Sequence, residues 1–390
     1  MIRISRRTFL EASAGAVGFA AASKVLGKTT QDIGKLDLPT SPVAIGRCRK
    51  YDYAAIKNSL SNLFDALGNI QNLVNGKPVV IKVVAHPPGN IDSLNSFLCY
   101  NSHPEVVKAA ARLFLDAGAT HVTVTENIYA ISGGAADFTA MGYDIASFQS
   151  ELGVTRITFR NCRNLEGFAS YADRPVGSGS YLYDFFRLNR VFDFADGEAV
   201  FVSLAKMKNH QIAGVTLAMK CLFGIAPSAW YGQPSQDESS TNSRGGSFHN
   251  AESSYPGRNG HAGYGAAGDN VPRVIVDLNR ARPIHLAILD GITMGHGSEG
   301  PWTRAPMGIA SPGLLLAGRN AVCVDSVATA VMGYNPQGAD YQFPWPNACN
   351  HLTLAAAQGI GTNNPDQIEV RGLSVAGARY DLPPTPDTTG

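Results

Sequence analysis

The stretch that decides the fold runs from Ala199 to Gly224 and reads AVFVSLAKMKNHQIAGVTLAMKCLFG. It opens with an apolar run of the length and composition typical of a buried strand. The next residues are basic, with Lys206, Lys208 and His210 at every second position. The apolar spacing that follows predicts a helix over residues 213–223, which carries Lys220. We therefore expect a strand that leads into a helix, with cationic groups concentrated at the junction.

Outside this stretch, predicted strands and helices alternate with short connections. Strands are predicted at 43–47, 79–84, 122–124, 154–159, 284–289, 313–317 and 368–370, and helices at 53–67, 104–117, 138–152, 271–280, 321–332 and 352–357. This alternation predicts an α/β fold with a mostly parallel sheet and helices on both faces, and we divide it into two lobes, 43–195 and 196–378. The glycine- and serine-rich region 228–270 interrupts the pattern. It is interpreted either as a lid over the site or as a solvent-exposed insertion.

The composition and the first residues of the chain indicate its partners and its location. The chain has 390 residues, 16% of them charged, and a net charge of +1, which gives no electrostatic case for nucleic-acid binding. The sequence Ser5-Arg6-Arg7-Thr8-Phe9-Leu10 has the form of a twin-arginine signal, and residues 1–30 are interpreted as an export signal and the start of a linker. The alternative is an ordinary amphipathic start with a chance arginine pair. We expect export to the periplasm or beyond by the twin-arginine machinery, with no stable membrane span.

Cysteine spacing limits the cofactors. The six cysteines are scattered singly and no C-x-x-C is present, so an iron–sulfur cluster is not expected. Most are expected to be buried small hydrophobic residues, although an oxidising compartment would permit disulfides whose pairing the spacing does not give. Export of folded proteins is compatible with a cofactor and does not require one.

The predicted strand ends bring chemistry-bearing residues to one edge of the sheet, where ligands of open α/β sheets bind. Glu126, Lys206 and Asp290 end three strands, and Lys82 lies within a fourth. A buried lysine must meet a carboxylate, meet an anionic ligand or extend to the sheet edge. For Lys82 we favour the ligand. The face shared by Lys206, Lys208 and His210 suits phosphate or carboxylate recognition, with His210 as proton donor or metal ligand. The alternative is a solvated strand end, above all at Lys208.

Two further groups of residues are weaker candidates. Thr216 and Lys220 are four residues apart on one face of the predicted helix, whose start near Gly214 could hold an anion. The alternative is a polar helix face in solvent, and a Schiff-base lysine here would need a lowered pKa. Asp290, His296 and Glu299 could bind a divalent metal or carry out acid–base chemistry, or Asp290 could cap backbone amides in a tight loop. Asp325 is predicted to be a helix cap rather than a catalyst.

Several motifs occur in an order that resembles a known family. They are Lys82 in VVIKVV, Ser102-His103-Pro104-Glu105, Ser203 to His210, Gly214 to Gly224, Asp290-Gly-Ile through Gly300-Pro301, and Asn320 to Asp325. Together they resemble the domain-of-unknown-function family 362 over residues 43–375. The resemblance supports Lys82, Lys206, His210, Lys220 and Asp290 as site residues and supplies no reaction. Some members of the family carry a ferredoxin-type iron–sulfur domain, whose cysteine run this chain lacks.

These observations predict an enzyme that acts on an anionic small molecule in a cleft lined by lysine and histidine. Lys206, His210 and Lys220 are the predicted catalytic residues, Lys82 and Thr216 the predicted ligand-binding residues, and Asp290, His296 and Glu299 the predicted metal ligands. In this hypothesis His210 transfers a proton while Asp290 orients it or holds the metal. Two alternatives stay open: a binding or accessory protein without turnover, and an electron-transfer partner.

Overall fold

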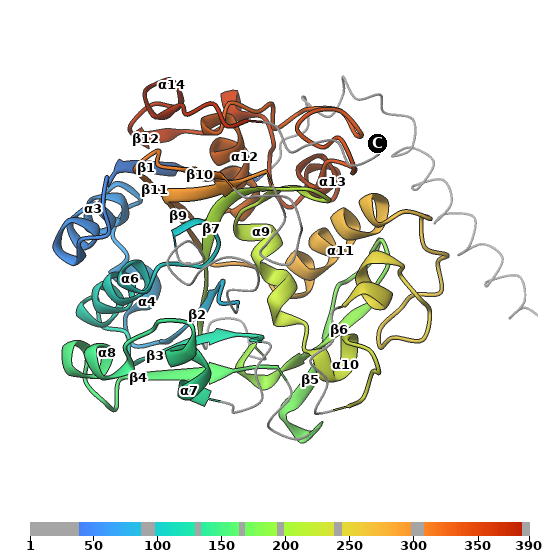
Figure 1. The fold of residues 1–390 in the computed structure, drawn as a ribbon, viewed down its shortest axis with the longest axis horizontal. Helices are drawn as coiled ribbons and strands as arrows, with labels where there is room; N and C mark the ends of the chain where they lie inside the picture. The colour runs from blue at the N-terminus through green and yellow to red at the C-terminus, as the bar shows by residue number, and fades with distance from the viewer. Residues whose placement is uncertain are drawn as a thin grey trace, which may run out of the picture. The chain divides into compact units, whose positions relative to one another are not determined.

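A computed structural model of the chain describes residues 39–86, 98–128, 134–163, 168–192, 199–237, 244–297 and 308–383. The predicted export signal and Glu299 lie outside these residues. Within them, one sheet has ten strands, in the order β12-β1-β11-β9-β7-β2-β3-β4, with β8 added to β7 and β10 to β9 (Figure 1). The strands are β1 (Val43–Arg47), β2 (Pro78–Val83), β3 (His121–Glu126), β4 (Ile157–Asn161), β7 (Val200–His210), β8 (Gly214–Thr216), β9 (Leu286–His296), β10 (Gly308–Ala310), β11 (Leu314–Gly318) and β12 (Val370–Gly372).

The centre of the sheet is parallel, as predicted. Strands β9, β7, β2, β3 and β4 run in one direction, and β11 runs antiparallel between β9 and β1. A separate antiparallel pair is formed by β5 (Tyr171–Pro175) and β6 (Phe185–Asn189). The carboxyl ends of β2, β3, β7 and β9 therefore meet at one edge of the sheet.

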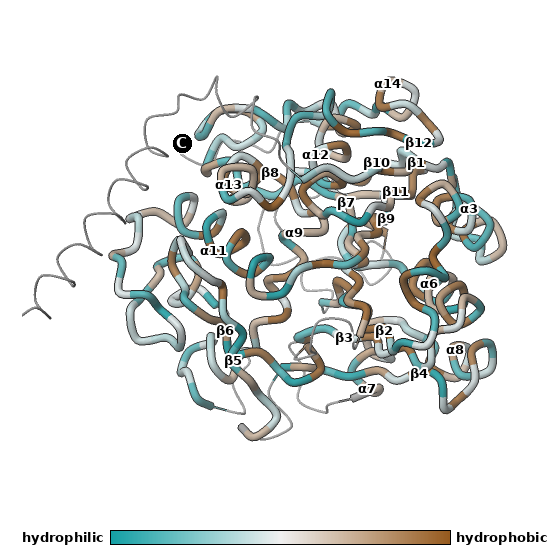
Figure 2. The backbone as a smooth tube through the Cα atoms, turned by 180° about the vertical axis from the view of Figure 1, so that it is seen from behind, coloured by the Kyte–Doolittle hydropathy of each residue, from teal (hydrophilic) through white to brown (hydrophobic). Residues whose placement is uncertain are grey.

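Helices cover both faces because the central strands are apolar on both sides. In β7, Val200, Val202 and Leu204 belong to one hydrophobic cluster, and Phe201, Ala205 and Met207 belong to the other. Figure 2 shows the same strands as a hydrophobic centre surrounded by more hydrophilic turns. The helices of the first face are α3 (Tyr53–Ala66), α4 (Gln71–Val74), α6 (Pro104–Asp116), α7 (Gly134–Ala140) and α8 (Ile145–Leu152). Those of the second are α9 (Ala218–Cys221), α10 (Ser228–Tyr231), α11 (Ala267–Ala281), α12 (Ala321–Val331), α13 (His351–Ala357) and α14 (Val375–Ala378).

The predicted helix over 213–223 is wrong in its first half. Gly214–Thr216 forms β8, which turns back and pairs antiparallel with β7. Gly214 has a φ of 72°, which a helix does not use, and the amides of Ile212 and Ala213 donate to the His210 ring rather than to a helical carbonyl. The helix is confined to α9, followed by the 3₁₀ turn η3 (Leu222–Ile225). Thr216 and Lys220 therefore lie on a strand and a helix, not on one helix face.

The predicted helix over 138–152 is divided in two. α7 ends at Ala140 and α8 begins at Ile145, and Gly142 between them has a φ of 85°. The side chain of Asp144 then accepts a hydrogen bond from the amide of Ser147, which caps α8. A left-handed glycine followed by a new N-cap ends one helix and begins another.

The described parts of the region 228–270 are anchored in the core. Tyr231 and Phe248 are fully buried, and both rings contact Tyr183 and Phe186. Phe248 belongs to a single π-helical turn, η4 (Gly245–His249). These contacts contradict a wholly solvent-exposed insertion, while the role of a lid stays a prediction.

No helix in the described ranges is long and apolar enough to cross a bilayer. The sheet takes strands from both halves of the chain, and the two-lobe division at residues 195 and 196 stays a prediction.

Candidate functional site

Lys82 forms a buried ion pair rather than facing a ligand. Its side chain is 1% exposed, and Nζ lies 2.8 Å from Glu126 Oε2 at the end of the neighbouring strand β3. Nζ also donates to the Val83 carbonyl oxygen at 2.6 Å and lies 3.4 Å from Cys221 Sγ. Burial alone would lower the pKa of Lys82, but the Cys221 sulfur and the Glu126 carboxylate raise it above its usual value. The pair leaves Lys82 charged and neutralised from within the protein, which is the carboxylate alternative, and a ligand-binding role for Lys82 stays a prediction.

Gly224 allows η3 to cover this pair closely. A Cβ atom at Gly224 would lie 2.1 Å from Glu126 Oε1 and 2.6 Å from Lys82 Cε. Any side chain there would displace the ion pair, so the glycine is required by packing.

Lys206 is neutralised in the same way on the opposite face of the sheet. Lys206 and Asp290 are direct partners in the register of β7 and β9, and Nζ lies 2.9 Å from Asp290 Oδ2. Lys206 Nζ also donates to the Tyr51 hydroxyl at 2.6 Å, and that hydroxyl donates to Asp290 Oδ1 at 3.0 Å. Asp290 further accepts from the amides of His103 and Ile292, each at 3.2 Å. Burial lowers the pKa of Lys206 although Asp290 opposes this. The Asp290 carboxylate is thus committed to Lys206, Tyr51 and backbone amides, and His210 is not among its contacts.

Lys208 is buried without a carboxylate. It is 1% exposed, so the alternative that it is solvated is wrong. Its ammonium group lies 3.4 Å from the Tyr100 carbonyl oxygen and 3.1 Å from the centre of the Tyr100 ring. Among the described residues no Asp or Glu pairs with it. Burial first, and the charge of Lys220 second, lower the pKa of Lys208 well below its usual range.

The sheet register explains this difference between two lysines on one strand. Lys206 pairs with Asp290, but a bulge shifts the register so that Lys208 pairs with Gly295. The bulge therefore places a glycine, not a carboxylate, beside Lys208.

Lys220 is the centre of what we call the basic cluster: Lys208, Lys220, His86 and His210. Its ammonium group lies 4.0 Å from the centre of the Phe223 ring. Burial is the largest cause of the lowered pKa of Lys208, His86 and His210. The charge of Lys220 lowers the pKa of all three further. The cluster draws one residue each from α9 and the segment after β2, and two from β7. Residues far apart in sequence thus lie within the influence of one positive charge, that of Lys220.

His210 is held as a neutral hydrogen-bond donor. Its Nδ1 accepts from the amides of Ile212 and Ala213, each at 3.1 Å. A neutral imidazole that accepts at Nδ1 carries its proton at Nε2. Because burial and the lysine charges keep the pKa of His210 well below its usual value, the ring presents Nε2–H and no positive charge at neutral pH.

Thr216 joins the basic cluster from β8. It is the direct partner of Lys208 in the β7–β8 hairpin, and directly opposed residues of an antiparallel pair project to the same face. Thr216 is 5% exposed, and its hydroxyl oxygen is buried with no hydrogen-bond partner among the described residues. A buried hydroxyl without a partner indicates a missing acceptor or donor at this position.

Asp325 fixes the helix that carries Lys220. Its carboxylate accepts from the amides of Ala218 and Met219 at 2.9 and 2.8 Å, at the start of α9. The N-cap residue Leu217 has no side chain able to do this, so α12 supplies the cap across space. Burial raises the pKa of Asp325 to about 7. Asp325 is thus a helix cap, as predicted, but for α9 and not for its own helix α12, whose N-cap is Asn320.

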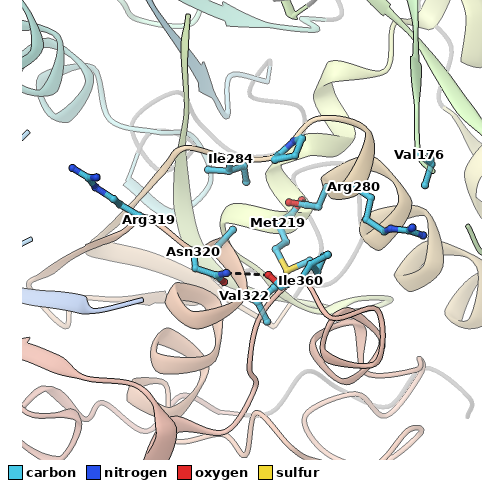
Figure 3. Close-up of a pocket in the computed structure, with 11 residues that line it drawn as sticks. Val176, Met219, Arg280, Ile284, Arg319, Asn320, Val322 and Ile360 are labelled. Atoms are coloured by element: carbon cyan, nitrogen blue, oxygen red, sulfur yellow. Dashed lines mark hydrogen bonds between the residues drawn. The ribbon is translucent and has the colours of Figure 1, made fainter. Parts of the chain in front are cut away.

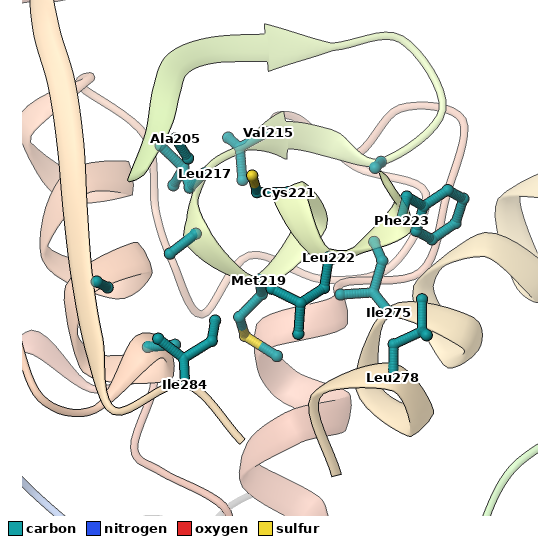
Figure 4. Close-up of a cluster of buried hydrophobic side chains, with 14 of the residues drawn as sticks. Ala205, Val215, Leu217, Met219, Cys221, Leu222, Phe223, Ile275, Leu278 and Ile284 are labelled. Atoms are coloured by element: carbon teal, nitrogen blue, oxygen red, sulfur yellow. The ribbon is translucent and has the colours of Figure 1, made fainter. Parts of the chain in front are cut away.

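Apolar packing holds α9 from the other side. Figure 4 shows Met219 and Leu222 beside Ile275 and Leu278 of α11, and all four are fully buried. Asn279 also donates from Nδ2 to the Met219 carbonyl oxygen at 3.1 Å. The position of Lys220 is therefore set by two helices that the sequence places far downstream.

The predicted metal ligands do not come together in the described part of the chain. Asp290 and His296 are six residues apart on β9, too far at about 3.3 Å per residue to share one ion. His296 pairs with Gly308 of β10, and burial lowers its pKa. In the described ranges no three His, Cys, Asp or Glu side chains gather as a metal site. Glu299 lies outside those ranges, so a metal site that includes it stays a prediction.

Figure 3 shows the residues that line a cavity of about 280 Å³. Its lining is mainly apolar, with Met219, Ile284, Val322 and Ile360, and Arg280 and Arg319 lie at its sides. In Figure 3 the two guanidinium groups extend away from each other. No residue of the basic cluster lines this cavity, so the candidate site is defined by its side chains and not by this volume.

Comparison with known proteins identifies the family. The family described as "Domain of unknown function (DUF362)" matches residues 79–330. The chain belongs to this family. It is also similar to a thylakoid-associated protein of Synechocystis sp., with 25% identity over 325 residues that cover 77% of this chain and 83% of the relative. A crystal structure of a Thermotoga maritima protein aligns with 69% of this chain at 16% identity and a TM-score of 0.32, and the chain spans 56% of that protein's length.

Proposed function

We propose that this protein binds a small anionic molecule, carrying a carboxylate or a phosphate, at the basic cluster. The observation that carries the proposal is the pairing of Lys208 with Thr216 beside Lys220. Both are buried, Lys208 has no carboxylate and the Thr216 hydroxyl has no partner among the described residues. An anion placed there would supply the acceptors that these groups lack.

The acidic residues at this edge of the sheet support the same proposal. Glu126 is committed to Lys82, and Asp290 is committed to Lys206. Both carboxylates are therefore engaged by other lysines, while the charge of Lys220 acts on Lys208, His86 and His210. Electropositive sites of this kind at strand carboxyl ends suit anion capture.

Each residue has a distinct role in this proposal. Lys220 supplies the attracting charge, and the Thr216 hydroxyl supplies a neutral donor. Lys82 and Lys206, predicted to be ligand-binding and catalytic, instead stabilise the sheet edge as internal ion pairs. The family description adds no reaction, and the name of the thylakoid-associated relative gives a location and no ligand.

Binding of simple anions to purified protein tests the proposal. We expect inorganic phosphate, sulfate or acetate to raise the thermal unfolding temperature of the wild type, since a ligand at 100 times its Kd stabilises the native state by about 2.7 kcal/mol. Long equilibration is needed because the site is buried. Lys220→Met and Thr216→Val should each weaken binding roughly tenfold or more, as expected for a lost hydrogen bond to a charged group.

Lys57→Met is the matched control, because Lys57 is a partly exposed lysine on α3 with a side chain 35% exposed. It should leave anion binding unchanged. Stabilisation that is equal in the wild type and both site variants would contradict the proposal.

A further inference from the structure

We propose that Lys208 is a nucleophilic amine that forms a Schiff base with the carbonyl group of an anionic substrate, such as a 2-oxo acid. This inference rests on the anion-binding function proposed above and adds a chemical class to its ligand. It also assigns to Lys208 a reaction that the sequence pattern raised only for Lys220.

The comparison of three buried lysines carries the inference. Lys82 and Lys206 lie 2.8 and 2.9 Å from carboxylate oxygens, which keep a lysine protonated. Lys208 is equally buried, yet its hydrogen bond is a 3.4 Å contact with a carbonyl oxygen. A lysine in a desolvated site without a counter-charge favours the neutral amine, which is the nucleophilic form.

A neighbouring cation strengthens the same preference. Lys220 of α9 carries a charge that acts on Lys208, and two like charges oppose each other. The groups that act on Lys208 are Lys220 and Cys221 of the α9 segment, Cys99 before α6, and Lys206 on its own strand. Of these, the lysines oppose its protonation, and only the two thiols favour it. Catalytic lysines that react at neutral pH use this combination of burial and an adjacent cation.

The surrounding donors suit the remaining chemistry. In the forward step, the Lys208 nitrogen forms a bond to the carbonyl carbon, and the carbonyl oxygen takes up a proton to become the hydroxyl group of a carbinolamine. This hydroxyl group then leaves as water with a proton from the nitrogen, and a C=N bond remains. The Thr216 hydroxyl lies opposite Lys208 on the same face and can hydrogen-bond the carbonyl oxygen as it gains charge. Lys220 can hold the carboxylate or phosphate of the same molecule. No oxidant, reductant or metal is required.

Trapping with borohydride tests the inference directly. The wild type is incubated at neutral pH with pyruvate and sodium borohydride, whose hydride reduces the imine to a secondary amine. We expect one adduct, heavier than the protein by the mass of the substrate less one oxygen atom, and peptide mapping should place it at Lys208. Acetaldehyde, which has a carbonyl group and no carboxylate, should need at least a tenfold higher concentration.

Variants make the result specific. Lys208→Arg has a side chain of similar length that cannot form an imine, so the adduct should disappear while circular dichroism shows that the fold is retained. Lys220→Met should move the pH profile of trapping to higher pH, because the neighbouring charge is gone. Lys57→Met should have no effect.

The outcomes separate the two proposals. If phosphate stabilises the wild type but pyruvate leaves no adduct at Lys208, or labels surface lysines in the same proportion, the Schiff-base inference is overturned and anion binding stands. If no anion stabilises the protein, the proposed function itself fails. An adduct at Lys208 that persists unchanged in Lys220→Met across the pH range would also overturn the role given to the paired cations.

Discussion

At the scale of single residues, the ion pairs separate structural lysines from the candidate functional one. Lys206 and Lys208 lie two positions apart on β7 and are both buried, but among the residues that the structure describes only Lys206 pairs with a carboxylate. Their removal should therefore have opposite consequences. Removing Lys206 leaves Asp290 as an uncompensated buried charge, whereas removing Lys208 leaves no stranded carboxylate in the described part of the chain.

We predict that Lys206→Met lowers the free energy of unfolding by about 3–5 kcal/mol. Lys208→Met should change it little or raise it, because an apolar side chain replaces a buried amine that lacks an ion pair. Urea denaturation of both variants at pH 7 measures the difference. Equal destabilisation would mean that Lys208 has a structural partner comparable to Asp290.

At the scale of secondary structure, the short helix α9 depends on elements far away in sequence. Four residues form too short a helix to be stable alone, and its N-cap Leu217 contributes no side-chain acceptor. The Asp325 carboxylate from α12 and the apolar side chains of α11 supply what the helix lacks. The position of Lys220 therefore depends on tertiary contacts.

This dependence predicts a pH effect on stability. Burial raises the pKa of Asp325 from 3.8 to about 7, so the folded protein binds this proton more tightly than the unfolded chain does. The contribution of Asp325 to the free energy of unfolding is fully present below about pH 4. It is lost as the pH rises from 4 to 7 and stays constant at higher pH. At 1.36 kcal/mol per pKa unit the loss is on the order of 4 kcal/mol.

The Asp325→Asn variant cannot titrate, so its free energy of unfolding should fall less between pH 4 and pH 7 than that of the wild type. The comparison isolates Asp325 from other carboxyl groups such as Asp277, whose pKa burial raises to about 6. Denaturant unfolding at several pH values measures both slopes. Parallel slopes would show that Asp325 does not carry the linkage.

At the scale of the whole molecule, we propose that the protein folds before it is exported. The pair Arg6-Arg7 has the form of a twin-arginine signal, and the six cysteines are all buried as free thiols in this structure. A protein with its thiols inside the core is suited to export in the folded state.

We predict that the double substitution Arg6→Lys and Arg7→Lys prevents export in a bacterial host that has the twin-arginine pathway. Fractionation and immunoblotting should then find the full-length precursor in the cytoplasm, while the wild type is processed and periplasmic. Substitution of Lys28 and Lys35 by arginine, downstream in the same segment, is the control and should leave export intact. Export of the double variant would contradict the proposal.

Much of the fold follows from local pattern. β1 occupies the predicted residues 43–47, and α3 and α6 end within one residue of the predicted helices. The hairpin of β7 and β8 could not be predicted in this way, because apolar spacing over 213–223 fits a helix as well as a strand and a turn. Packing against α11 and the cap from Asp325 decide between them.

The stretch from Ala199 to Gly224 contains features that local sequence predicts and others that depend on tertiary contacts. Sequence by itself determined the strand, the alternation of Lys206, Lys208 and His210, and their place at the carboxyl edge of a parallel sheet, because periodicity is a local property. Only the tertiary structure decided which lysines are neutralised. Lys82 and Lys206 pair with carboxylates 44 and 84 residues away in the sequence. A bulge in the sheet register places Gly295 beside Lys208 instead. Ion pairing depends on distances of a few ångströms between strands, and no pattern along the chain specifies them.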